Sequence, residues 1–216
     1  MLWLFSPPRA SVYLRRMDYL WTPWRYAYLV DADQAAKLGH KGVPPALAAW
    51  PGDCHCVFCN LIAATRFAVE HGMPAIDADR AANIVFRSQH SFICLNAFPY
   101  SSGHVMIVPY AHQDSLAYLE SAAALEMMTL AQRTDAVLRQ VYSPQGINLG
   151  MNLGQAAGAG IAEHLHMHVL PRWLGDSNFM TVISETRVLP ETLEITWQRL
   201  HQEFNRFPVK PLRENE

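Results

Sequence analysis

Three histidines alternate with apolar residues in the segment His164-Leu165-His166-Met167-His168. On a β-strand successive side chains point to opposite faces, so the three imidazoles would share one face while Leu165 and Met167 enter the core. An unprotonated imidazole is a nucleophile at neutral pH, and a neighbouring ring can hold it in one tautomer. We therefore interpret this segment as a candidate centre for phosphoryl or nucleotidyl transfer.

Two other interpretations of the three histidines remain open at this point. They could bind a metal ion, because histidine is a common metal ligand. However, same-face neighbours on a strand lie roughly 6.5 to 7 Å apart, which disfavours three of them on one ion. They could also belong to a half-buried strand that happens to carry polar histidines.

A loop rich in glycine and alanine, residues 152–160, precedes the histidines with the sequence NLGQAAGAG. Its small residues allow backbone amides to approach an anion closely. The same pattern alone is also typical of a plain β-turn. Its position before the histidines favours phosphate binding.

The segment Cys56-Val57-Phe58-Cys59 has the spacing with which two thiolates bind one zinc ion from a tight turn. Two thiolates do not complete a site, and the sequence around them lacks the βαβ pattern of a thioredoxin-like redox motif. Three of the four cysteines lie within six residues, which indicates a metal or redox site rather than a disulfide framework. A reducing, cytoplasmic location is therefore expected.

Short β-like runs and two amphipathic stretches predict an α+β domain. The expected strands are residues 83–87, 91–96, 104–109, 146–153, 164–172 and 179–184. The expected helices are residues 115–141, with capping oxygens from Asp114 and Ser115, and residues 190–204.

The composition is that of an ordinary globular protein, with 50% hydrophobic and 17% charged residues and a net charge of -2 in 216 residues. No basic surplus indicates a nucleic-acid polymer as partner, and no apolar run predicts a membrane span. We divide the chain into residues 1–53 and 54–216. The first part comprises an extension, an aromatic arm at 17–30 and a loop insertion, and the second is the domain with its C-terminal tail.

The motif HLHMHVL at 164–170 resembles the signature of the histidine triad (HIT) family. The similarity extends through the 152–160 loop, LNAFPYSSGH at 95–104, GHVMIVPYAH at 103–112 and CVFC at 56–59. LWTPWRYAYL at 20–29 and Pro171-Arg172-Trp173 also resemble a bacterial branch of the family whose members are similar to diadenosine tetraphosphate phosphorylases.

The resemblance implies a fold and an activity. The fold would be α+β, with a five-stranded antiparallel sheet, a long helix and a C-terminal helix, paired into a homodimer or higher homo-oligomer whose sheets join. The activity would be cleavage of dinucleoside polyphosphates. His166 would form the covalent nucleotidyl intermediate, His168 would contact the α-phosphate and bridging oxygen, and His164 would support the site from behind.

Other roles also come from the resemblance. His112 and His164 would complete a structural zinc site with Cys56 and Cys59. The nucleoside would rest in an apolar pocket near Phe98. The implied substrate-binding residues are Asn96, Asn152, Gly158, Ala159, Gly160 and Trp173.

One departure from the family bears on the reaction. Hydrolytic members commonly carry Gln followed by Ser or Thr where this chain has Gly160 and Ile161, which favours phosphate rather than water as acceptor and co-substrate. The alternatives are a nucleotidyltransferase, whose triad ends in Gln where this chain has His168, and a non-catalytic, zinc-stabilised nucleotide-binding protein. His104, at the beginning of a strand, is expected to make a structural hydrogen bond only.

Overall fold

The computed structural model describes residues 42–176 and 190–206. The extension at 1–16, the aromatic arm at 17–30 and the strand expected at 179–184 lie outside the described residues. The described elements follow in chain order: η1 Pro45–Leu47, α3 Val57–Glu70, α4 Ala75–Ala81, β1 Ile84–Arg87, β2 Ser91–Leu95, β3 Val105–Pro109, α5 Ser121–Tyr142, β4 Gly146–Met151, η2 Gln155–Ala157, β5 Met167–Arg172 and α7 Leu193–Arg206.

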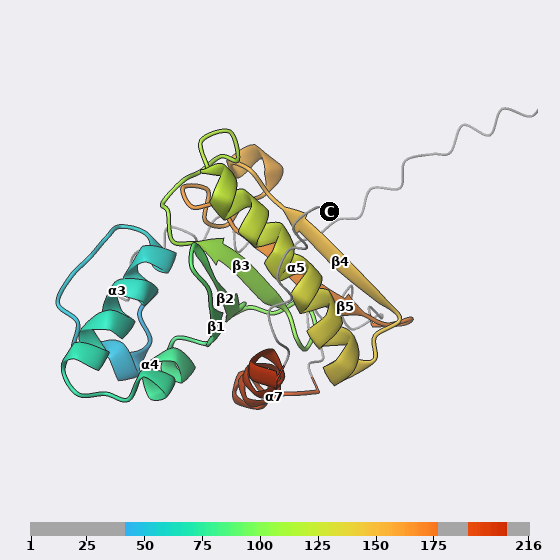
Figure 1. The fold of residues 1–216 in the computed structure, drawn as a ribbon, viewed down its shortest axis with the longest axis horizontal. Coiled ribbons are helices and arrows are strands. Elements are labelled where there is room, and N and C mark those ends of the chain that lie inside the picture. The colour runs from blue at the N-terminus through green and yellow to red at the C-terminus, as the bar shows by residue number, and fades with distance from the viewer. Residues whose placement is uncertain (1–41, 177–189, 207–216) are drawn as a thin grey trace, which may run out of the picture.

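The described strands form one antiparallel sheet of five strands in the order β1-β2-β3-β5-β4 (Figure 1). Strand β5 therefore lies between β3 and β4. In this register His168 is opposite Met106 on β3 and Gly150 on β4. The α+β architecture expected from the sequence is confirmed, including the long helix and the C-terminal helix.

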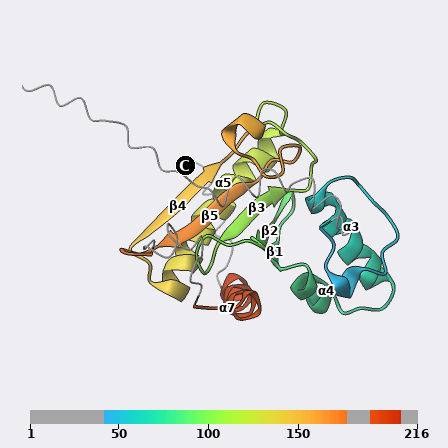
Figure 2. The ribbon, with the colours of Figure 1, turned by 180° about the vertical axis from the view of Figure 1, so that it is seen from behind.

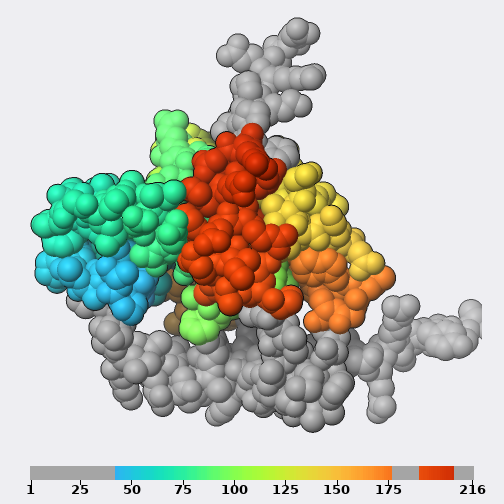
Figure 3. Space-filling view, turned by 90° about the horizontal axis from the view of Figure 1, so that it is seen from below, coloured from blue at the N-terminus to red at the C-terminus, as the bar shows by residue number. Residues whose placement is uncertain are grey.

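The strands alternate between two apolar clusters, one on each side of the sheet. Ile93 of β2 and Ile107 of β3 face a cluster with α5 and α7, whereas Phe92 and Val108 face a second cluster with α3 and α4. Figure 1 shows α5 crossing the sheet, and Figure 2 shows the opposite face. Viewed from below, α7 separates α3 and α4 from β4 and β5 (Figure 3).

The structure differs from the expected elements in three places. Helix α5 begins at Ser121, not at Ser115, because the Ser115 hydroxyl accepts a hydrogen bond from the Ala117 amide in a separate turn. The two helices at 57–70 and 75–81 were not expected. Strand β5 begins only at Met167, after two of the three histidines.

None of the helices in the described ranges is long and apolar enough to cross a membrane.

Candidate active site

The histidines lie at the start of β5 and on the sheet face opposite α5. His164 and His166 belong to the segment just before the strand, where the Leu165 amide donates to the carbonyl of Gln113 at 2.6 Å. Leu165 and Met167 are buried in the cluster under α5. The alternation predicted from the sequence therefore holds, although only His168 lies within the strand itself.

A backbone carbonyl fixes the tautomer of His166. Its Nδ1 lies 2.8 Å from the carbonyl oxygen of His164. A carbonyl only accepts hydrogen bonds, so Nδ1 carries the proton and Nε2 carries the lone pair. Burial lowers the pKa of His166 from that of a free imidazole, and its side chain is almost fully enclosed. His166 is thus held neutral, with Nε2 available as a nucleophile.

A second chain of hydrogen bonds fixes the opposite tautomer in His168. The Tyr100 amide donates to Nδ1 of His104 at 3.1 Å, which leaves the His104 proton on Nε2. That nitrogen lies 3.0 Å from Nδ1 of His168 and donates to it. His168 therefore carries its own proton on Nε2. Burial, and then the neighbouring His166, lowers the pKa of His168 to about 4, so at neutral pH the ring is an uncharged donor.

His104 is a residue of the candidate site that sequence reasoning missed. It does make a hydrogen bond, as expected, but its partner is His168 rather than a purely structural group. It is 1% exposed and precedes β3, whose Met106 pairs with His168. His104 stands two residues before Met106, so the two side chains point to the same face of the sheet. Once the strand order is known, this spacing places His104 on the same face as His168.

Two cysteines and two histidines converge beside the triad. Each of four residues offers one ligand atom, and these four atoms all lie within 4.8 Å of one another. The residues are Cys56, Cys59, His112 and His164. The Sγ atoms lie 3.3 to 3.6 Å from the nearest Nδ1 atoms. A zinc ion with ligands at 2.0 to 2.3 Å in a tetrahedron requires S···N separations of about 3.5 Å. The four residues named from the sequence are therefore brought together, and their geometry fits zinc.

The chemistry of the donors also fits a divalent cation. Burial, followed by the charge of Cys56, raises the pKa of the Cys59 thiol to about 12. Two adjacent thiolates are stable here when a cation compensates their charge. Nε2 of His164 donates to the Pro109 carbonyl at 2.9 Å, which leaves Nδ1 unprotonated and pointing at the sulfur atoms.

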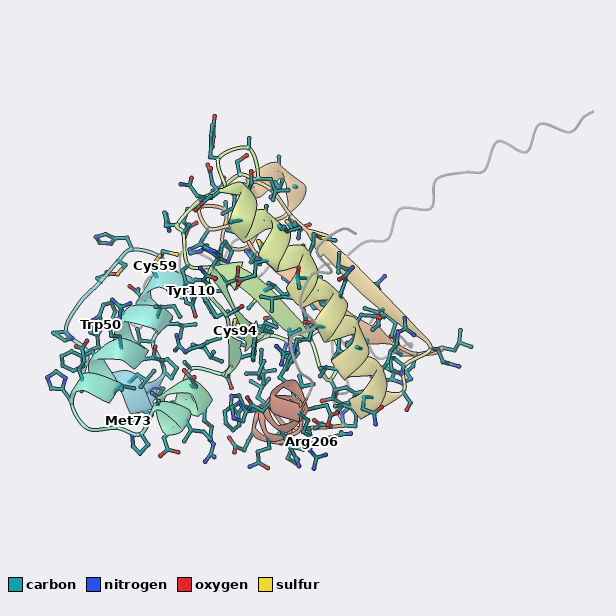
Figure 4. All side chains as sticks on the ribbon, viewed as in Figure 1. Trp50, Cys59, Met73, Cys94, Tyr110 and Arg206 are labelled. Atoms are coloured by element: carbon teal, nitrogen blue, oxygen red, sulfur yellow. The ribbon has the colours of Figure 1, made fainter. Side chains whose placement is uncertain are left out.

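The other two cysteines lie outside this cluster. Cys94 is buried in strand β2, and burial raises its pKa to about 12. Cys54 is exposed. Cys59 and Tyr110 line one pocket at the start of α3. Figure 4 labels both of them, together with Cys94.

The glycine-rich loop lies next to the histidines, because Met151 pairs with Met167 and the loop starts at Asn152. The Asn152 side-chain amide donates to the Gly158 carbonyl at 3.5 Å. The amides of Gly158 and Ala159 donate to loop carbonyls at 2.8 and 3.3 Å. Both amides are thus engaged within the loop, whereas Gly160 is exposed.

Phe98 and Trp173, the two aromatic residues expected at the nucleoside, remain predictions, and the structure gives their surroundings. Phe98 is 74% exposed, and the nearby cavity of about 260 Å³ is lined by its neighbours Ala97 and Pro99. Trp173 directly follows the last residue of β5, and its ring contacts that of Tyr142 edge-on.

Asn96 does lie beside the histidines. Its side-chain nitrogen is 3.4 Å from Nδ1 of His104, and its oxygen accepts from the Phe98 amide at 2.9 Å. It therefore shapes the loop that holds His104.

The fold and the alternating histidines define a class. A model of the HIT domain matches residues 78–173. A relative from Mycobacterium tuberculosis, described as AP-4-A phosphorylase, is 34% identical over 193 residues, which cover 89% of this chain and 87% of the relative. The chain belongs to the HIT family, and it is similar to this relative along most of its length.

Solved structures of the family share the fold. A Zn-bound histidine triad protein from Mycobacterium smegmatis is 25% identical, with a TM-score of 0.50, covering 70% of this chain and 94% of that chain. A protein from Sulfolobus tokodaii, described as a hypothetical histidine triad nucleotide-binding protein, is 20% identical, with a TM-score of 0.52, covering 70% of this chain and 93% of that chain.

Proposed function

We propose that this protein is a nucleotidyl-transferring enzyme that cleaves dinucleoside polyphosphates of the diadenosine tetraphosphate type. The observation that carries the proposal is the pair of opposite tautomers: His166 has a lone pair on Nε2, while His168 has a proton there. A nucleophile and a donor side by side are what cleavage of a phosphoanhydride needs.

The reaction would proceed in two displacements. Nε2 of His166 attacks the α-phosphorus, a P–N bond forms and the P–O bond to the leaving polyphosphate breaks. His168 donates its Nε2 proton in a hydrogen bond to the departing oxygen. In the second step an acceptor oxygen attacks the same phosphorus, and the P–N bond breaks to regenerate His166. Amides near Gly160 would offset charge on the phosphate oxygens.

We infer that the acceptor is inorganic phosphate. Gly160 and Ile161 present no polar side chain to the site, and Ile161 packs against the apolar cluster under α3, so the local donors for a second anion are backbone amides. The name of the relative from M. tuberculosis supports the same acceptor. Water as acceptor would make the protein a hydrolase.

The test is product analysis with diadenosine tetraphosphate, in phosphate-free buffer and with phosphate labelled with oxygen-18. Phosphorolysis gives ATP plus ADP, with the label in the terminal phosphate of ADP. AMP plus ATP at a rate independent of phosphate would show hydrolysis. Binding without either product would support the non-catalytic alternative.

We further propose that zinc binds Cys56, Cys59, His112 and His164 as a structural ion. When bound, zinc would neutralise the two thiolates and tie the start of α3 to the segment that precedes β5. Figure 4 shows that α3 lies beside the sheet rather than within it. A bond through the ion would fix the position of that helix.

We propose a homodimer formed through β4. Among the strands that the structure describes, β4 is the last in the sheet, and Leu149 is 48% exposed on it. An unpaired edge with an apolar side chain readily pairs with another strand. Antiparallel pairing with a second copy would extend the sheet across both chains.

A further inference from the structure

Phe58 reaches the histidines from a helix that is not part of the sheet. It lies in the first turn of α3, between Cys56 and Cys59, and its side chain is 2% exposed. Its ring centroid lies 5.3 Å from that of His164 and 5.2 Å from that of His166. One aromatic ring thus contacts both a residue of the Cys2His2 cluster and the nucleophile.

The hydrogen bond from Nδ1 to the His164 carbonyl does not by itself fix the His166 ring. It restrains one atom, and the terminal torsion of a histidine side chain has a broad energy profile. Rotation would break that bond and turn Nε2 away from substrate. His168 packs against one side of the ring at 4.9 Å, nearly perpendicular to it. Phe58 packs against it at an interplanar angle of 55°.

We propose that Phe58 is a positioning residue that holds the His166 imidazole in the orientation for attack. This inference rests on the proposed nucleotidyl transfer. Phe58 and His168 confine the ring, so the Nδ1 hydrogen bond persists and Nε2 keeps its direction. The cluster of Cys56 and Cys59 holds the helical turn that carries Phe58, and this gives the CxxC segment a role in the chemistry.

Phe92 provides a matched control because it shares the packing of Phe58 but not its contacts with histidine. It is 0% exposed and meets Phe58 edge-on at 6.5 Å, and its other ring contact is with Tyr110 at 5.5 Å. Phe→Leu at either position removes a similar buried volume and should lower stability similarly. Only Phe58→Leu should release His166.

The experiment compares zinc-loaded wild type, Phe58→Leu and Phe92→Leu. Rapid quench into alkaline denaturant, in which the P–N bond to histidine survives, measures formation of the nucleotidyl-enzyme in a single turnover with diadenosine tetraphosphate. We expect Phe58→Leu to slow this step by about ten- to a hundredfold, with little change in KM. Phe92→Leu should slow it by less than about threefold, with similar melting temperatures and equal zinc content in both variants. Phe58→Met, which keeps more of the volume, repeats the comparison if Phe58→Leu does not fold.

Proton NMR gives a readout that does not need turnover. The buried, hydrogen-bonded Nδ1 proton of His166 should give a downfield resonance that His166→Ala lacks. It should persist in Phe92→Leu and broaden by exchange in Phe58→Leu. Should wild type form no nucleotidyl-enzyme, the proposed function fails while this resonance still tests the positioning of the ring.

Three results would overturn the role of Phe58. Equal slowing in both Leu variants would show a general packing effect. A raised KM with an unchanged single-turnover rate would make Phe58 a nucleoside contact. A resonance that stays sharp in Phe58→Leu would show that His166 holds its orientation without this ring.

Discussion

The replacement of His166 by alanine removes the atom on which the proposed intermediate forms. We expect turnover to fall by at least about a thousandfold, since a covalent nucleophile contributes several kcal/mol of barrier lowering. Nucleotide binding and the circular dichroism spectrum should change little. His71→Ala, on the exposed end of α3, is the control. More than a tenth of wild-type rate in His166→Ala would refute the assignment.

His104 is expected to act through His168 rather than on substrate. His104→Phe keeps a ring of similar size but cannot donate to Nδ1 of His168, whose tautomer is then no longer fixed. We expect kcat to fall by roughly ten- to a hundredfold, within the range of a lost proton donor, with KM nearly constant. Steady-state kinetics measure this split, and a kcat within twofold of wild type would contradict the relay.

The pH dependence of kcat tests the environment of His168. Its pKa is lowered to about 4 by burial and then by His166, so the ring stays neutral well below the ordinary imidazole value of about 6.5. Protonation would place a second N–H against His104 and stop its donation. Activity should therefore stay level from pH 8 to about pH 6 and decline toward pH 4. A half-maximal rate at pH 6.5 or above would count against this.

The chemistry of the site could be predicted from the sequence more fully than its surroundings. The triad alternation and the Cys2His2 set were expected, the latter through family resemblance, and the structure brings both sets together. The partnership of His104 with His168 could not be predicted locally, because 64 residues separate them and only the pairing of β3 with β5 joins them.

At the scale of the element, we expect helix α3 to depend on the zinc proposed at its first turn. We expect one zinc per chain, measured by elemental analysis, and loss of that zinc in Cys56→Ser. The metal-free variant should unfold at a lower temperature, because binding free energy is part of folding free energy in such sites. Cys54→Ser removes an exposed thiol outside the cluster and should retain full zinc content. A stable, active, metal-free wild type would contradict this prediction.

Strands were easier to predict than helices, because the alternation of a strand is visible in the sequence whereas the periodicity of helix α3 is hidden. The run Ser91–Leu95 alternates between two apolar clusters, and its bounds were predicted to within one residue. Helix α3 carries apolar residues around much of its circumference, which hides its periodicity. Ser115 has a capping hydroxyl, but it closes a turn six residues before α5 begins.

At the scale of the whole molecule, the exposed edge of β4 predicts association. Leu149→Lys places a charge on this edge, which opposes pairing with a second strand. We expect sedimentation equilibrium to show a dimer for wild type and a monomer for the variant. Ile195→Lys on α7 changes a similarly exposed residue, 47% against 48%, and should remain dimeric. A monomeric wild type would exclude the proposed interface.

Main-chain groups set the tautomers of His164, His166 and His104, and this affects how the site can evolve. The Pro109 and His164 carbonyls and the Tyr100 amide belong to the peptide backbone, so most substitutions at these positions alter a side chain and leave the bonding atom in place. Substitutions around the site can therefore change which substrate it accepts, while the same nitrogen of each histidine keeps its proton. Proline at position 100 is an exception, because it removes the amide hydrogen itself.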